Sequence, residues 1–213
     1  MVLSPEARAL WETALALNRE AAAVSPHVAA LPPLIFVTDP ERTPEPWRIA
    51  ARLPAGAGVI YRAFGADDRL ETARRLREAT AQAGVRLLIG LDAELAAAVE
   101  ADGVHLPGRM LDQAPALRAA WPDWLLTGAV HGAEDLERTE GLSAAIVSPV
   151  FPAGGASASK PALGIEAFGG FAQLIRTPVY ALGGINAGNA VGLIGSGACG
   201  IAAVGAIVEA SGP

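Results

Sequence analysis

The feature that most constrains the fold of this chain is a repeated alternation of short apolar runs with longer amphipathic stretches. Eight runs of four to six residues are apolar at nearly every position, as strands buried on both faces are. They cover residues 34–37, 58–61, 85–89, 103–106, 125–130, 144–147, 179–182 and 200–204. Strand–helix alternation predicts parallel strands with right-handed crossovers. Eight such units predict a closed (β/α)₈ TIM barrel.

Helices are predicted between these runs and ahead of them. The intervening helix-like segments lie near 43–53, 67–83, 93–101, 112–120, 133–139, 164–175 and 187–196. Ser4, Pro5 and Glu6 form a helix start, and that first helix is expected to continue to about Ala23. We therefore expect one domain over 1–213, with a helical extension at 1–31 and the barrel at 34–208.

The end of the chain leaves room for only a short eighth outer helix, because nine residues follow Val204. We expect the N-terminal helix to cover part of that gap; the alternatives are a cap on the barrel floor or an oligomer contact. A doubly wound open sheet is the rival fold. It would usually carry Gly-x-Gly-x-x-Gly after the first strand, where this chain reads Thr-Asp-Pro-Glu at 38–41.

Composition excludes several functional classes. The chain is 52% hydrophobic and 18% charged, which argues against disorder. Its net charge of −6 offers no basic face for nucleic acid. Because Cys199 is the only cysteine, no disulfide can form within the chain, which fits a reducing, cytoplasmic location. We expect Cys199 to be a small buried apolar residue. No signal peptide or membrane span is predicted.

Two glycine-containing segments near the end of the chain predict a phosphate site. Gly183 and Gly184 follow the seventh run, and adjacent glycines let a backbone approach a ligand closely. Val204, Gly205 and Ala206 lead from the eighth run into a short helix, whose first N–H groups favour an anion. Phosphate binds at these loops in many such barrels. The alternative is a pair of tight turns.

The other predicted strand ends supply candidate catalytic groups. Arg62 follows the second run and places a cation at the barrel mouth. Asp92 follows the third and is a candidate to orient a base, bind a metal or cap the next helix. His131 ends the fifth, suited to proton transfer near neutral pH or to packing. Lys160 is the only charge in the 153–163 loop, where it either closes over an anion or is a solvated lysine.

A metal site has little support in the sequence. Magnesium sites usually combine one or two carboxylates with substrate phosphates. Asp92 has no second carboxylate at the next strand end, where the chain reads Pro-Gly-Arg-Met at 107–110. His105, inside the fourth run, is either a layer-filling residue or a ligand contact.

Five segments, in order, resemble thiamine phosphate synthase and its TenI-type relatives over residues 34–208. They are Leu-Ile-Phe-Val-Thr-Asp at 34–39, Ala-Asp-Gly-Val-His-Leu-Pro at 101–107, Ser-Pro-Val-Phe-Pro at 148–152, Gly-Gly-Ile at 183–185 and Gly-Ala-Cys-Gly-Ile-Ala at 197–202. The resemblance implies a TIM barrel that takes a small phosphorylated thiazole-type substrate. It implies neither a nucleic-acid nor a membrane partner, and a homodimer remains an assembly to test.

The synthase joins a pyrimidine pyrophosphate to a thiazole phosphate with Mg²⁺, and its motif is incomplete here. Its Gln-x-Arg-x-Lys reads Ile-Tyr-Arg-Ala-Phe at 60–64, so only Arg62 remains. Its first metal carboxylate matches Asp92, but the second falls on or near Met110. Its Thr-x-Thr-Lys is replaced by a stretch ending Ser-Ala-Ser-Lys at 157–160. The thiazole-phosphate half is therefore retained better than the pyrophosphate half.

TenI-type thiazole tautomerases also resemble this chain, at 119–123 and 128–135. Their acid/base histidine matches His131, and their reaction implies no metal or other cofactor. The sequence thus favours a TenI-like isomerase. A divergent Mg²⁺-dependent synthase, which would use Asp92, Arg62 and Lys160, is the second hypothesis. A non-catalytic binder of thiazole or thiamine phosphates is the third, and another phosphate-binding barrel is the fourth.

Overall fold

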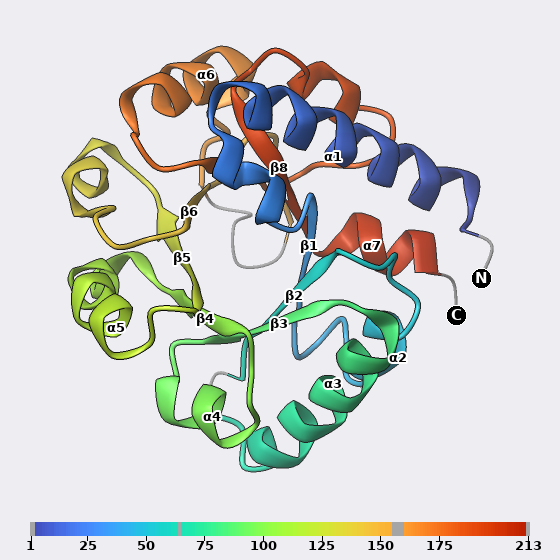
Figure 1. Cartoon of the computed structure of the whole chain (residues 1–213). Helices are drawn as coiled ribbons and strands as arrows, with labels where there is room; N and C mark the ends of the chain where they lie inside the picture. Colours follow the sequence, from blue (N-terminus) through green and yellow to red (C-terminus); the bar gives the residue numbers. More distant parts are fainter. Residues whose placement is uncertain (1–2, 64, 155–159, 212–213) are drawn as a thin grey trace.

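A closed parallel barrel forms the centre of the molecule. The computed structural model describes residues 3–63, 65–154 and 160–211. Eight strands pair in sequence order, and β8 returns to β1 to close the barrel (Figure 1). The strands are β1 (Leu34–Val37), β2 (Gly58–Tyr61), β3 (Arg86–Gly90), β4 (Gly103–Leu106), β5 (Leu125–Val130), β6 (Ala144–Val147), β7 (Val179–Leu182) and β8 (Ala198–Ala203). The predicted (β/α)₈ fold is confirmed, with small shifts at the bounds of β3 and β8.

Alternate residues of each strand point to two separate apolar cores. One set packs with the helices, and Phe36 on β1 belongs to it. The other set fills the inside of the barrel and contains no residue of the outer helices that follow the strands. Its larger members are Ile35, Ile60, Leu88, Leu125, Ile146 and Tyr180. Cys199 lies in this inner core, 1% exposed, and burial raises the pKa of its thiol. The prediction that Cys199 is a buried apolar residue is therefore confirmed.

The outer helices are unequal in length. They are α2 (Pro46–Ala50), α3 (Arg69–Ala83), α4 (Ala93–Ala98), α5 (Ala114–Ala120), α6 (Gly164–Leu174) and α7 (Gly205–Ser211). Short 3₁₀ turns supplement them at η1 (Pro26–Ala30), η2 (Gly108–Gln113), η3 (Ala133–Arg138) and η5 (Ala190–Leu193). The helices predicted near 133–139 and 187–196 are thus 3₁₀ turns. Glycines at 188, 192, 195 and 197 explain the second case, because glycine weakens a helix.

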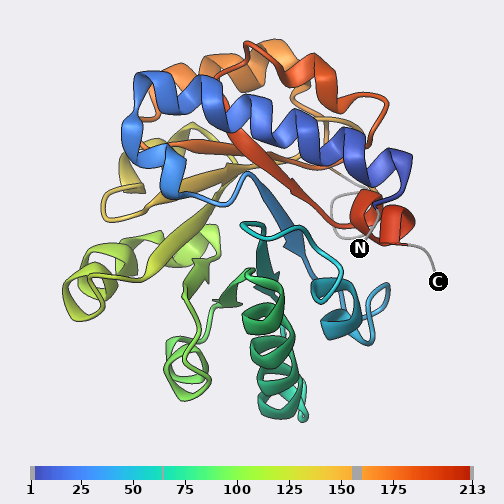
Figure 2. The same cartoon turned by 45° about the vertical axis from the view of Figure 1, so that its right-hand side comes forward.

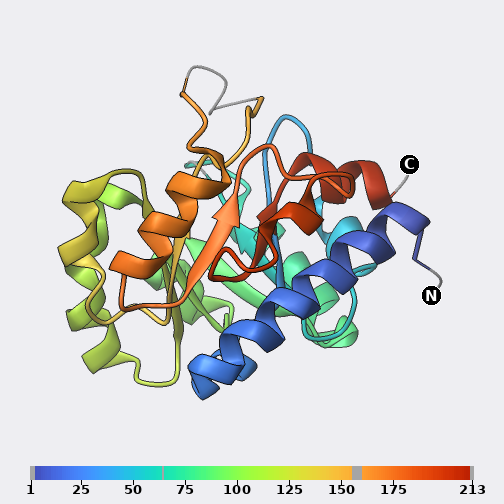
Figure 3. The same cartoon turned by 90° about the horizontal axis from the view of Figure 1, so that it is seen from above.

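Helix α1 (Pro5–Val24) covers the strand that α7 is too short to cover. It lies along β8 in Figures 1 and 2, and Figure 3 shows it beside the last segments of the chain. Leu10, Ala14 and Leu17 form its buried face. The buried Asn18 amide donates to the carbonyl oxygens of Val28, Leu31 and Cys199. The structure therefore matches the expectation that this helix fills the gap.

Two further contacts fix α1 at its ends. The Ser4 hydroxyl accepts a hydrogen bond from the Ala7 N–H and donates one to the Ala210 carbonyl in α7, each 3.1 Å long. Val28 of η1 joins the inner core and so closes the barrel floor.

Within the described ranges, no helix combines the length and the apolar character needed to cross a membrane.

Candidate functional site

A cavity of about 290 Å³ opens at the C-terminal ends of β1, β2, β7 and β8. All five residues predicted to bind phosphate line it: Gly183, Gly184, Val204, Gly205 and Ala206. The charged side chains Asp39, Arg42, Arg62 and Glu209 also line it. The two glycine segments, distant in sequence, are therefore brought together beside two arginines.

The loop after β7 has a conformation that requires glycine. Gly183 has φ 102° and Gly184 has φ 64°, values that side-chain-bearing residues rarely adopt. A Cβ on Gly184 would collide with the carbonyl oxygen of Pro152 and would lie 2.8 Å from Cβ of Phe151. The Phe151 N–H also donates to the Gly183 carbonyl at 3.0 Å. The backbone after β6 therefore packs directly on the proposed phosphate loop and fixes its shape.

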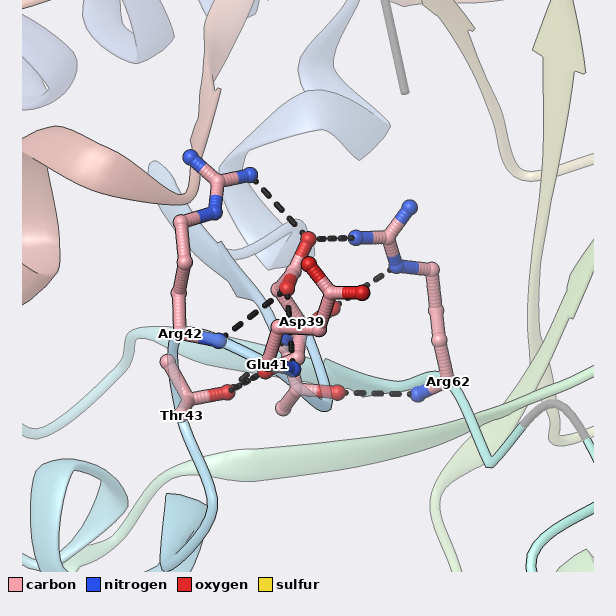
Figure 4. A network of polar contacts seen from close by, with 6 residues as sticks. Asp39, Glu41, Arg42, Thr43 and Arg62 are labelled. Atoms are coloured by element: carbon pink, nitrogen blue, oxygen red, sulfur yellow. Dashed lines mark hydrogen bonds and ion pairs between the residues drawn. The ribbon is translucent and has the colours of Figure 1, made fainter. Parts of the chain in front are cut away.

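A carboxylate shared by two arginines forms the opposite wall (Figure 4). Oδ2 of Asp39 lies 3.1 Å from Nη2 of Arg42 and 3.5 Å from Nη2 of Arg62. Arg62 is further held by its Nε–H, which donates to the Thr38 carbonyl at 2.7 Å. Its backbone N–H donates to the Thr38 hydroxyl at 2.9 Å. The ends of β1 and β2 thus position both guanidinium groups.

Charge stabilises the ionised forms of this cluster. Burial alone would raise the pKa of Asp39, but hydrogen bonds from the side chain and backbone of Arg42, with its positive charge, hold that pKa below its usual value. Burial lowers the pKa of Arg62, and Asp39 opposes that change. An arginine still remains protonated at any physiological pH. The wall therefore carries two positive charges and one negative charge, before Glu209 is counted.

His105 lies on β4 and interacts electrostatically with both Arg62 and His131. Its Nδ1 is 2.9 Å from Oγ1 of Thr127, which is fully buried. This contact joins the neighbouring strands β4 and β5. Burial, with the charges of Arg62 and His131, lowers the pKa of His105 to about 4. The His105 ring is therefore neutral at physiological pH.

His131 is exposed at the end of β5, outside the set of residues that line the cavity. Its backbone N–H donates to Oδ2 of Asp135 at 3.0 Å, and Arg138 holds the same carboxylate. The ring Nδ1 lies 3.5 Å from the carbonyl oxygen of Ser148. The ring is therefore accessible for proton transfer, and it interacts electrostatically with His105.

The remaining predicted residues lie away from the cavity. Oδ1 of Asp92 accepts the Leu95 N–H at 2.8 Å and so caps α4, one of the roles foreseen for it. Its Oδ2 is 3.9 Å from Nε of Arg69. Lys160 is exposed and does not line the cavity. Phe64 and the segment 157–159, which depart from the synthase motifs, fall outside the described residues.

The donor set does not fit a magnesium ion held by two carboxylates. One oxygen of Asp92 is engaged as a helix cap, and the position expected for the second carboxylate falls on or near Met110. Among the described residues, no group of three or more histidine, cysteine, aspartate and glutamate side chains is arranged to hold a metal. A magnesium ion would therefore need most of its ligands from substrate and water.

Sequence reasoning missed two residues of the site. It did not single out Arg42, although an acid and a base three residues apart after a strand end are a recognisable local pair. It also missed Glu209, because a charge in the short last helix gives no local signal for its position.

Comparisons with known proteins agree with this fold. Residues 34–207 match the family described as thiamine monophosphate synthase. A thiamine-phosphate synthase of Bacillus velezensis is 34% identical over 150 residues, covering 69% of this chain and 66% of that protein. One from Methanoculleus marisnigri is 33% identical over 165 residues, covering 74% and 78%. The solved thiamine phosphate pyrophosphorylase of Pyrococcus furiosus superposes with a TM-score of 0.70 at 25% identity, covering 84% of this chain and 91% of that one.

Proposed function

We propose, since this chain belongs to the thiamine monophosphate synthase family, that it joins a pyrimidine pyrophosphate to a thiazole phosphate. The observation that carries this proposal is the cavity itself, where the glycine loops after β7 and β8 face Arg62 and Arg42 across one space. A condensing enzyme needs two anion-binding walls, one for each substrate. The relatives named thiamine-phosphate synthase support this activity over tautomerisation, so the isomerase favoured by the sequence takes second place.

The residues present would act mainly by binding and by electrostatics. The backbone at Gly183, Gly184 and Gly205 would hold the thiazole phosphate. When the pyrimidine leaves its pyrophosphate, negative charge develops on the leaving oxygen, and a preorganised cation lowers the barrier to that step. Arg62 is the candidate for this role, because Thr38 and Asp39 fix it before substrate arrives.

Thiazole tautomerisation is the second candidate, because of two observations. His131 presents an accessible imidazole at the end of β5, and the second carboxylate that the synthase needs falls on or near Met110. In this reaction His131 would move a proton while the ring aromatises, and the glycine loops would hold the phosphate as before. The phosphate site is thus common to both proposals, which differ in the residue that would act on the bound ligand: Arg62 in the synthase and His131 in the tautomerase.

The decisive experiment is a product assay by mass spectrometry and NMR. Purified protein is mixed with thiazole carboxylate phosphate and pyrimidine pyrophosphate, with and without Mg²⁺. Thiamine phosphate or its carboxylate establishes the transferase, and Arg62→Met should then lower kcat/KM about 100-fold. Faster aromatisation without condensation establishes the tautomerase, and His131→Ala should abolish it while leaving phosphate binding intact. Neither product, with tight ligand binding, would identify a non-catalytic binder.

A further inference from the structure

We propose that Arg42 is the side chain that binds the ligand's phosphate in this cavity, and that Asp39 is its positioning residue. The inference rests on the proposed function only in taking the ligand to be phosphorylated. It assigns the phosphate cation to the loop after β1, whereas the sequence analysis considered Lys160, in the loop after β6, either as a cation that closes over an anion or as a solvated lysine. Lys160 is exposed and does not line the cavity.

The loop after β1 is built to hold Arg42 in one place. Oδ1 of Asp39 accepts the backbone N–H groups of Glu41 and Arg42, each at 3.2 Å. The Thr43 hydroxyl donates to the Asp39 carbonyl at 2.7 Å and accepts the Asp39 N–H at 2.9 Å. These contacts close the loop on itself, as Figure 4 shows. Arg42 therefore extends from a fixed base.

The guanidinium of Arg42 reaches the phosphate end of the cavity. Its Nη1 is 3.8 Å from the position that a Cβ on Gly205 would occupy. Its Nη2 contacts Asp39 at 3.1 Å, which leaves further N–H donors for a ligand, because a guanidinium has five. The side chain is 41% exposed, whereas that of Arg62 is 24% exposed. Arg42 thus faces the glycine loops, and Arg62 lies deeper.

Because Glu209 lies at the phosphate end of the cavity, a bound phosphate needs a cation beside it there. Its Oε1 is 3.9 Å from the same Cβ position at Gly205, so a bound phosphate would lie near a carboxylate. Arg42 offsets that repulsion, and the ionised Asp39 keeps its guanidinium from turning toward solvent. The proposal therefore predicts opposite effects of neutralising Arg42 and neutralising Glu209.

The test is a titration of the full chain with inorganic phosphate, followed by ³¹P NMR. Arg42→Met should raise the Kd about tenfold or more, the usual loss for a charge-assisted hydrogen bond. Glu209→Gln should lower the Kd. Arg48→Met is the matched control, because Arg48 is 69% exposed and pairs with Glu45 on α2; it should leave the Kd unchanged.

Asp39→Asn tests the positioning role. It should weaken phosphate binding in the natural background, but should cause no further loss of phosphate affinity when it is combined with Arg42→Met. A loss of equal size in both backgrounds would mean that Asp39 acts only through loop structure and would overturn its assignment. Unchanged affinity in Arg42→Met, an equal loss in Arg48→Met, or no phosphate binding by the natural chain would overturn the proposal for Arg42. Because the titration needs no turnover, it is independent of which product the protein makes.

Discussion

The two sides of the barrel mouth differ in how they are built. On the side of β1, β2, β7 and β8, glycine loops and fixed arginines enclose one cavity. On the side of β3 to β6, the candidate groups are dispersed: Asp92 caps a helix, and His131 is exposed. The first side depends on backbone conformation, which few substitutions preserve. The second depends on side-chain identity, which a single substitution changes while the fold is retained.

This difference separates what the hypotheses share from what distinguishes them. Each hypothesis requires a phosphorylated ligand in the cavity. The side of β3 to β6 carries His131, which the tautomerase requires, and there the second carboxylate of the synthase falls on or near Met110. Substitutions on the two sides should therefore differ in which property they change as well as in the size of the effect.

The largest effect is expected from Gly184→Ala on the cavity side. The new Cβ would meet the Pro152 carbonyl and Phe151, at a φ that alanine disfavours. We expect the free energy of unfolding to fall by about 2 kcal/mol or more and phosphate binding to be lost. Chemical denaturation and phosphate titration measure the two effects.

Gly170→Ala is the matched control for that substitution. A Cβ there meets nothing within 4 Å, and the residue lies in α6. It should raise the free energy of unfolding by about 0.5–1 kcal/mol, as alanine does in a helix. Equal behaviour of the two variants would contradict the view that the cavity side depends on backbone conformation.

An intermediate effect is expected from His105 on β4, which is coupled electrostatically to Arg62 on the other side of the mouth. Its folded pKa of about 4 is below the ordinary value of 6.5, because of burial and the charges of Arg62 and His131. As pH falls from 6.5 toward 4, the unfolded chain gains a proton that the folded chain does not. The free energy of unfolding should therefore fall by about 1–3 kcal/mol across that window.

Denaturation curves at several pH values measure this loss. His105→Gln should flatten the dependence on pH between 4 and 6.5, whereas the exposed His27→Gln should leave it unchanged. Arg62→Met should reduce the dependence, since it removes one of the charges that lower the pKa of His105. If it does not, the two sides are electrostatically independent.

The smallest effect is expected on the side of β3 to β6, at Asp92. Asp92→Ala removes a helix cap and should cost about 1 kcal/mol of unfolding free energy, whereas Asp92→Asn should retain most of it. Comparing the activity of these two variants separates structure from chemistry. Full activity in Asp92→Asn would exclude a role for the carboxylate charge. Loss of activity in that stable variant would show that this side contributes to the reaction.

The sequence predicted the fold closely where local pattern determines structure. Runs such as 125–130 and 179–182 became strands with the predicted bounds, because buried parallel strands are apolar throughout. The sequence pattern predicted structure less well where glycine residues and tertiary packing compete with helix propensity. The segment 187–196 has helical spacing, yet its glycines and the neighbouring α1 leave only a 3₁₀ turn at Ala190–Leu193.

The site was predictable in part for a similar reason. Gly183 and Gly205 are recognisable because their position after a strand implies a loop near the mouth. Arg42 was missed because its role depends on reaching Gly205, which lies at the other end of the sequence. The lowered pKa of His105 was also hidden, since it depends on burial and on the charges of Arg62 and His131. Contacts between distant segments leave no signal in a single sequence.

The position of α1 along β8 has a consequence for how the chain must fold during synthesis. Residues 5–24 are synthesised well before the strand that they cover, Ala198–Ala203. Until that strand is made, the apolar face of Leu10, Ala14 and Leu17 lacks its native partner on β8. Contacts so distant in sequence form slowly. The nascent chain therefore carries an uncovered apolar helix until β8 has been made, and that helix is a surface to which chaperones can bind.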